Sequence, residues 1–82
     1  MTYILEFKPR ALKDLEGIPG QDRRRIFAKI ENLANDLAGD VKKLTGMTPE
    51  FRLRVGNYRV LFEIDGGRVV IYRVRHRREA YR

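Results

Sequence analysis

The sequence predicts an α+β fold, a two-layer sandwich in which a helical hairpin packs on one face of a sheet. Apolar and polar residues alternate near the N-terminus and through residues 51–75, which is the period of a strand. Between these segments apolar residues recur every three or four positions, the period of a helix. The expected order is strand, helix, helix and three strands (β-α-α-β-β-β), in a single domain over residues 1–82.

The first strand and both helices follow from local patterns. Tyr3, Leu5 and Phe7 alternate in the strand, and Pro9 opens the first helix because a first helical position needs no N–H group. The strand is expected either in the middle of the sheet or at its edge. The first apolar helical stripe is Ala11, Leu12, Leu15 and Ile18. The second is Ile26, Phe27, Ile30, Leu33, Ala34 and Leu37. Glycine and proline mark the helix ends, at Gly17, Pro19 and Gly39.

Residues 39–50 are rich in turn formers and are expected to connect the second helix to the sheet without structure of their own. In this segment Leu44 and Met47 are expected to tuck under the fold. The side chains of Lys42 and Lys43 are expected to stay in solvent.

Three antiparallel strands are expected in residues 51–75, with an Asp65-Gly66-Gly67 turn before the last. Their apolar face is predicted to consist of Phe51, Leu53, Val55, Tyr58, Val60, Phe62, Ile64, Val70, Tyr72 and Val74. Tyr58 and Tyr72 are therefore expected in the core. The opposite face carries arginines and is expected to remain open.

The positive charge is concentrated in the C-terminal part of the chain. Residues 1–50 hold nine Lys/Arg and eight Asp/Glu, a net charge of +1, whereas residues 51–82 hold nine and three, a net charge of +6. A concentrated positive field attracts polyanions, so nucleic acid is the expected ligand class. The chain has no cysteine and no apolar run near the roughly 20 residues of a membrane span. A cytoplasmic protein with no membrane contact is expected.

The composition excludes several catalytic schemes. The chain has no serine, no cysteine, one histidine and few clustered carboxylates, so neither a covalent nucleophile nor a metal site is expected, and no cofactor motif is present. Metal-free RNA cleavage fits these limits, because the ribose 2′-OH is itself the nucleophile. Side chains suited to hold the phosphate or move protons are Arg52, Arg54, Arg59, His76, Arg77, Arg78 and Tyr81. Arg73 and Arg75 are expected to be solvated or to steer phosphates.

Two motifs carry a family resemblance. LRVGNYRVLFEI at residues 53–64 and VRHRREAYR at residues 74–82 resemble the RelE toxins of the RelE/ParE superfamily. The resemblance implies an mRNA interferase that cuts the codon in the ribosomal A site. It also implies a type II toxin–antitoxin system with a RelB-like antitoxin as partner.

The family's site residues map onto this sequence by motif. The resemblance implies catalytic roles for Arg52, Arg54, Arg59, Arg77 or Arg78, and Tyr81. Arg59 and one arginine of the basic C-terminal tail, Arg77 or Arg78, would stabilise the phosphate charge. Tyr81 would stack on a base or help to move the 2′-OH proton. The nucleic acid contacts are expected at Arg52, Arg54, Arg73, Arg75, His76 and Arg82.

Two points stay open at this stage. The family's strand residues are lysines, and arginine is a poor base, so His76 or Tyr81 becomes the candidate for proton transfer. The competing functions are a ParE-like toxin that acts on DNA gyrase and a basic domain that binds RNA without cutting it.

Overall fold

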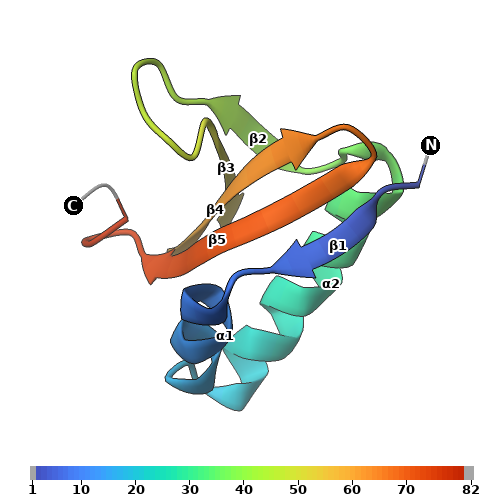
Figure 1. Ribbon diagram of the computed structural model, residues 1–82. Helices are drawn as coiled ribbons and strands as arrows, with labels where there is room; N and C mark the ends of the chain where they lie inside the picture. Colours follow the sequence, from blue (N-terminus) through green and yellow to red (C-terminus); the bar gives the residue numbers. More distant parts are fainter. Residues whose placement is uncertain (1, 81–82) are drawn as a thin grey trace.

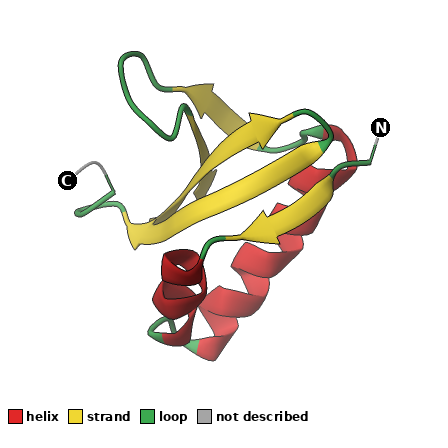
Figure 2. Ribbon diagram, in the orientation of Figure 1, coloured by secondary structure: helices red, strands yellow, loops and turns green. Residues whose placement is uncertain are grey.

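The computed structural model describes residues 2–80 and confirms the α+β sandwich (Figure 1). The elements are β1 (Ile4–Phe7), α1 (Pro9–Glu16), α2 (Gly20–Asp36), β2 (Asp40–Lys43), β3 (Phe51–Val55), β4 (Tyr58–Asp65) and β5 (Arg68–His76). Within the described residues the strands form one five-stranded sheet in the order β1-β5-β4-β3-β2. Figure 2 shows both helices on the same side of this sheet, so its other face is left uncovered by helix.

β1 lies at the edge of the sheet, which settles the position left open by the sequence. It pairs parallel with β5, whereas β2, β3, β4 and β5 pair antiparallel with their neighbours. The parallel pairing ends where the Lys8 N–H donates to the Ile71 carbonyl at 2.8 Å. Beyond that point the edge of β5 is covered by α1 instead of by a strand (Figure 1).

α1 begins at Pro9 as predicted, and the chain leaves it before Pro19. Ala11, Leu15 and Ile18 are buried, but Leu12 is 49% exposed. The prediction for Leu12 was wrong because a helix of eight residues presents only a narrow stripe to the sheet, and Leu12 lies beside that stripe.

α2 supplies the middle of the core through Ile26, Ile30 and Leu33, which are all fully buried. The helix ends at Asp36 and not at Gly39, because Leu37 adopts the left-handed conformation (φ 58°) and its N–H bonds back to the Leu33 carbonyl. Gly39 (φ 127°) is needed for another reason. A Cβ atom there would lie 2.7 Å from a methyl group of Leu53.

A short strand, β2, forms in the segment that the sequence predicted as a structureless connection. Asp40, Val41, Lys42 and Lys43 pair antiparallel with residues 51–54 of β3. Only Val41 packs against the core, since the strand lies at the edge of the sheet and needs little apolar surface. A single apolar residue is too weak a pattern to identify a strand.

A β-bulge between β4 and β5 changes which residues of β5 face the helices. Leu61 pairs with Arg73 but Phe62 pairs with Ile71, so Tyr72 is the extra residue. Val69 and Ile71 therefore join the core before the bulge, and Val74 joins it after the bulge. The prediction that Val70 and Tyr72 share the core face was wrong, because strict alternation cannot include an extra residue. Tyr72 is half-buried, with the Lys8 ammonium 5.4 Å from its ring centroid.

No helix in the described part of the chain is long and apolar enough to cross a membrane.

Candidate nucleic-acid site

The sheet face opposite the helices brings cationic side chains into two rows. Directly paired residues of neighbouring strands project on the same side. One row contains the pair of Lys42 with Arg52, and the next contains the pairs of Arg54 with Arg59 and of Arg59 with Arg75. The rows run across β2, β3, β4 and β5, so residues far apart in the sequence become neighbours.

An open pocket of about 310 Å³ lies in this region. Its lining, among the described residues, consists of Lys42, Leu44, Met47, Arg52, Arg54 and Arg59. The structure therefore brings together Arg52, Arg54 and Arg59, which the sequence analysis had selected from two separate strands. Four of the lining side chains are cationic and two are apolar. A pocket of this composition suits a ligand with a phosphate group beside a flat apolar surface, as in a nucleotide.

Arg52 is fixed in place by β2. Its Nη1 donates to the backbone carbonyl of Asp40 at 2.8 Å and to the Asp40 carboxylate at 3.2 Å. The Arg52 side chain is 15% exposed, so most of its stem is covered. A guanidinium held by two bonds through one nitrogen keeps its orientation while its other N–H groups remain available to an anion.

Arg59 is fixed by the turn that precedes it. Its Nη1 donates to the carbonyls of Gly56 and Tyr58 at 3.1 and 3.0 Å. Gly56 has φ +56°, and a Cβ atom at this position would lie 1.8 Å from Nη2 of Arg25. Glycine is favoured at this turn by its left-handed conformation, and a Cβ atom would also displace the guanidinium of Arg25, which reaches the turn from α2.

Arg54 and Lys42 differ from these two residues because neither forms a hydrogen bond or ion pair within residues 2–80. Both side chains are exposed. Unpaired cations beside two oriented guanidinium groups are a favourable arrangement for binding a phosphodiester, since the anion supplies the missing partner.

The sequence analysis missed three lining residues, which all come from β2 and the loop that follows it. Lys42, Leu44 and Met47 form one wall of the pocket. The available signal was the sequence Asp40-Val41-Lys42, in which one apolar residue lies between two charged ones. That signal is too short to show that Lys42 pairs with Arg52.

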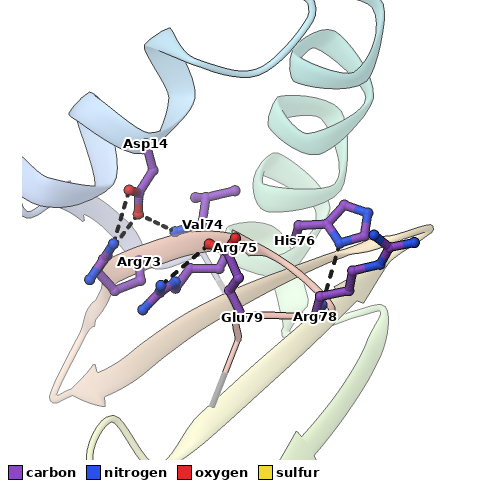
Figure 3. A network of polar contacts seen from close by, with 7 residues as sticks. All are labelled: Asp14, Arg73, Val74, Arg75, His76, Arg78 and Glu79. Atoms are coloured by element: carbon purple, nitrogen blue, oxygen red, sulfur yellow. Dashed lines mark hydrogen bonds and ion pairs between the residues drawn. The ribbon is translucent and has the colours of Figure 1, made fainter. Parts of the chain in front are cut away.

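Arg73 does not line the pocket, and its side chain is bound by Asp14 of α1 (Figure 3). Its Nε and Nη2 donate to the two carboxylate oxygens of Asp14 at 2.8 and 3.1 Å, and the Val74 N–H donates to the same carboxylate at 3.0 Å. Burial alone would raise the pKa of Asp14. The hydrogen bonds from Arg73 and Val74, with the charges of Arg73 and Arg75, outweigh burial and lower the pKa. This position of Arg73 gives no support to a phosphate contact.

The basic tail is folded back on the sheet. Arg75 pairs with Glu79 at 3.5 Å, and the Arg78 N–H donates to Nδ1 of His76 at 3.3 Å (Figure 3). The Arg77 N–H donates to the Asn57 carbonyl at 2.7 Å, which ties the tail to the turn beside Arg59.

His76 lies on the core side of the sheet, with its ring edge-on to Tyr58 at 5.6 Å. It therefore does not line the pocket. The side chains of Arg77 and Arg78 are exposed. Tyr81 and Arg82, which were both selected from the sequence, lie outside the described residues.

Comparison with known proteins places this fold in a family. A family model described as ParE toxin of type II toxin-antitoxin system, parDE, matches residues 5–81. The chain belongs to the RelE/ParE family of type II toxins. Toxin RelE3 of Methanocaldococcus jannaschii is 41% identical to this chain over 80 residues. The match covers 92% of this chain and 91% of that protein.

Two further relatives support the family assignment. The mRNA interferase toxin RelE of Escherichia coli is 28% identical over 87 residues, covering 99% of this chain and 92% of that protein. The RelE chain of the RelB-RelE antitoxin-toxin complex from Methanococcus jannaschii matches with a TM-score of 0.78. It is 36% identical, and the match covers 93% of this chain and 94% of that one. The resemblance to RelE toxins expected from the sequence is confirmed, as is the fold that it implied.

Proposed function

We propose that this RelE/ParE-family toxin inhibits translation by cutting mRNA in the ribosomal A site. The observation that carries the proposal is the pocket in which Arg52, Arg54, Arg59 and Lys42 converge on the open sheet face. The naming of the E. coli relative as an mRNA interferase supports the same activity.

The chemistry can proceed with the RNA, the protein side chains and water, which move the proton from the 2′-hydroxyl and supply one to the 5′-oxygen. The 2′-oxygen attacks the adjacent phosphorus, the bond from phosphorus to the 5′-oxygen breaks, and the products are a 2′,3′-cyclic phosphate and a 5′-hydroxyl. Charge on the non-bridging oxygens increases during this step. Oriented guanidinium groups stabilise that charge, because they need no reorganisation and stay protonated. Arg59 and Arg52 are held in this way by the bonds described above.

The remaining site residues have supporting roles in the proposal. Arg54 binds the phosphate as an unpaired cation, and Arg77 or Arg78 extends the positive surface from the tail, which is attached beside Arg59 through Asn57. Tyr81 stacks on a base or assists proton transfer. The apolar wall of Leu44 and Met47 packs against the face of a base.

A RelB-like antitoxin is the proposed protein partner, since the M. jannaschii relative was solved as a RelB-RelE antitoxin-toxin complex. The net charge of +7 favours an antitoxin segment rich in acidic residues against the open face. Affinity of the purified toxin for the antitoxin should fall as salt is added. Salt-independent binding would contradict an electrostatic contact.

Primer extension on a defined mRNA, with and without programmed ribosomes, tests the activity. The wild-type protein should produce cuts within A-site codons, and Arg59→Ala should lose them. Arg68→Ala is the matched control, because Arg68 is an exposed arginine of the same sheet that pairs with Glu6 and Asp65 and does not line the pocket. Absence of cuts by the wild-type protein would overturn the proposal.

The same experiment separates the competing functions. The second candidate is a ParE-like toxin that acts on DNA gyrase, and it is retained because the matching family model is described as a ParE toxin. That activity predicts intact mRNA, continued translation and DNA damage signalling on expression. A domain that only binds RNA predicts binding that depends on Arg59 without any cut.

A further inference from the structure

RNA cleavage at the pocket needs a group that accepts the 2′-OH proton. The cationic lining contributed by β3 and β4 consists of arginines, whose guanidinium groups do not give up a proton in proteins and so cannot accept another. Leu44 and Met47 are not basic. Among the described residues that line the pocket, Lys42 is the one whose side chain can become a neutral amine and take up a proton.

The position of Lys42 is set by backbone pairing. It lies directly opposite Arg52 in the ladder of β2 and β3, so its side chain projects onto the open face. Lys43 pairs with Phe51, whose ring stacks on the core residue Phe62, and projects from the other side of the sheet. The two neighbouring lysines are chemically identical, but only Lys42 lines the pocket with the arginines.

The charged groups around Lys42 leave its amine available. Arg52 and Arg54 face it from β3, and Arg59 faces it from β4. The carboxylate on its own strand, Asp40, is engaged by Arg52. Lys42 has no anionic partner within the described part of the chain, whereas Lys43 lies 3.9 Å from the Glu50 carboxylate.

We propose that Lys42 is the general base of the cleavage site, an inference that rests on the proposed function. The neutral amine takes the proton as the 2′-O–H bond breaks and the bond from the 2′-oxygen to phosphorus forms. The bond to the 5′-oxygen breaks, and water supplies the proton to this leaving group. Arg52, Arg54 and Arg59 bind the phosphate throughout the step.

Single-turnover cleavage on programmed ribosomes tests this role, measured between about pH 6 and pH 9. The rate of the wild-type protein should rise with pH, as expected for a step that needs a neutral base. Lys42→Arg keeps the positive charge but removes the base, so the rate near neutral pH should fall by about 100-fold and lose this pH dependence. Lys43→Arg is the matched control and should behave as the wild type.

Rescue of Lys42→Ala by a small amine separates proton transfer from charge. Methylamine should restore cleavage in proportion to its neutral form, whereas guanidinium at the same concentration should not. Equal rescue by guanidinium, or a Lys42→Arg variant with the rate and pH profile of the wild type, would overturn the inference. The inference would also be overturned if the cleavage rate lost its pH dependence in Tyr81→Phe but kept it in Lys42→Arg.

The two proposals fail in different ways. Cutting by the wild-type protein with no effect of Lys42→Arg would overturn the role of Lys42 alone. Absence of any cut by the wild-type protein would overturn both. Circular dichroism melts of the Lys42 variants should match the wild type, because position 42 is exposed and its side chain contributes nothing to the core.

Discussion

Arg73 and Arg54 occupy similar sequence surroundings, each flanked by strand residues that are apolar or aromatic, yet the fold gives them different environments. Arg73 is held by both oxygens of Asp14, which reaches it from α1. Arg54 has no carboxylate partner within residues 2–80 and lines the open pocket. The first arginine attaches a helix to the sheet, and the second is available to an external anion.

The difference shows that the fold, and not the neighbours of a strand arginine in the sequence, decides whether its guanidinium holds another element or lines the open pocket. Asp14 lies 59 residues before Arg73 in the chain, so the pairing depends on where α1 packs. α1 covers the end of β5 because β1 stops at Phe7. The length of one edge strand therefore decides which arginine becomes structural.

The largest expected effect is the loss of cleavage on substitution of Arg54, the one of these two arginines without a carboxylate partner in the described residues. Arg54→Ala should lower single-turnover cleavage by about 100-fold to 1,000-fold, because it removes one of the cations that stabilise the developing phosphate charge. Its free energy of unfolding should stay within about 0.5 kcal/mol of the wild type, as the side chain is exposed. A large loss of stability with unchanged cleavage would reverse the assignment of the two arginines.

Asp14→Asn should have the opposite outcome. It removes a charged acceptor shared by Arg73 and the Val74 N–H, and should lower the free energy of unfolding by about 1–3 kcal/mol. Urea unfolding measures this loss. Cleavage per folded molecule should be unchanged, and a selective loss of cleavage would place Arg73 in the site after all.

The pH dependence of stability tests whether the bond between Asp14 and Arg73 depends on the charge of the Asp14 carboxylate. The pKa of Asp14 is lowered in the folded protein, so its contribution to stability is complete above its unfolded pKa of about 3.9. The contribution is lost as the pH falls through the lower folded pKa. The wild type and Asp14→Asn should therefore converge in stability on acidification. A difference that persists to the lowest accessible pH would show that the bonds do not depend on the carboxylate charge.

The smallest effect is expected at Arg68, which pairs with Glu6 and Asp65 on the exposed rim of the sheet. Its side chain is 48% exposed, compared with 23% for Arg73. Arg68→Ala should change the free energy of unfolding by less than about 1 kcal/mol, since solvent screens exposed ion pairs. A cost equal to that of Asp14→Asn would mean that burial does not distinguish the two arginines.

Much of the fold was predictable because its signals are local. Pro9 marks the start of α1, and the fully buried stripe of Ile26, Ile30 and Leu33 marks α2. β2 was not predictable, since an edge strand with one core residue carries almost no pattern. The bulge at Tyr72 was not predictable either, because it arises from the pairing of two strands and leaves no mark in either one.

The candidate site likewise contains residues that could be predicted from the sequence and residues that could not. Alternation along β3 and β4 predicted that Arg52, Arg54 and Arg59 share a face, and their convergence on one pocket follows from cross-strand pairing. Lys42 could not be selected without knowing that β2 exists. Roles in catalysis for these residues, and for Tyr81, stay predictions that the cleavage assays test.

The way β2 is joined to the sheet has a consequence for how this toxin can evolve. Lys42 is positioned by main-chain hydrogen bonds, which form with any residue except proline, and its side chain supports no part of the core. Position 42 can therefore vary without cost to folding. With Lys42 as the proposed general base, substitutions at this position would change the cleavage rate step by step and leave the scaffold that an antitoxin recognises the same.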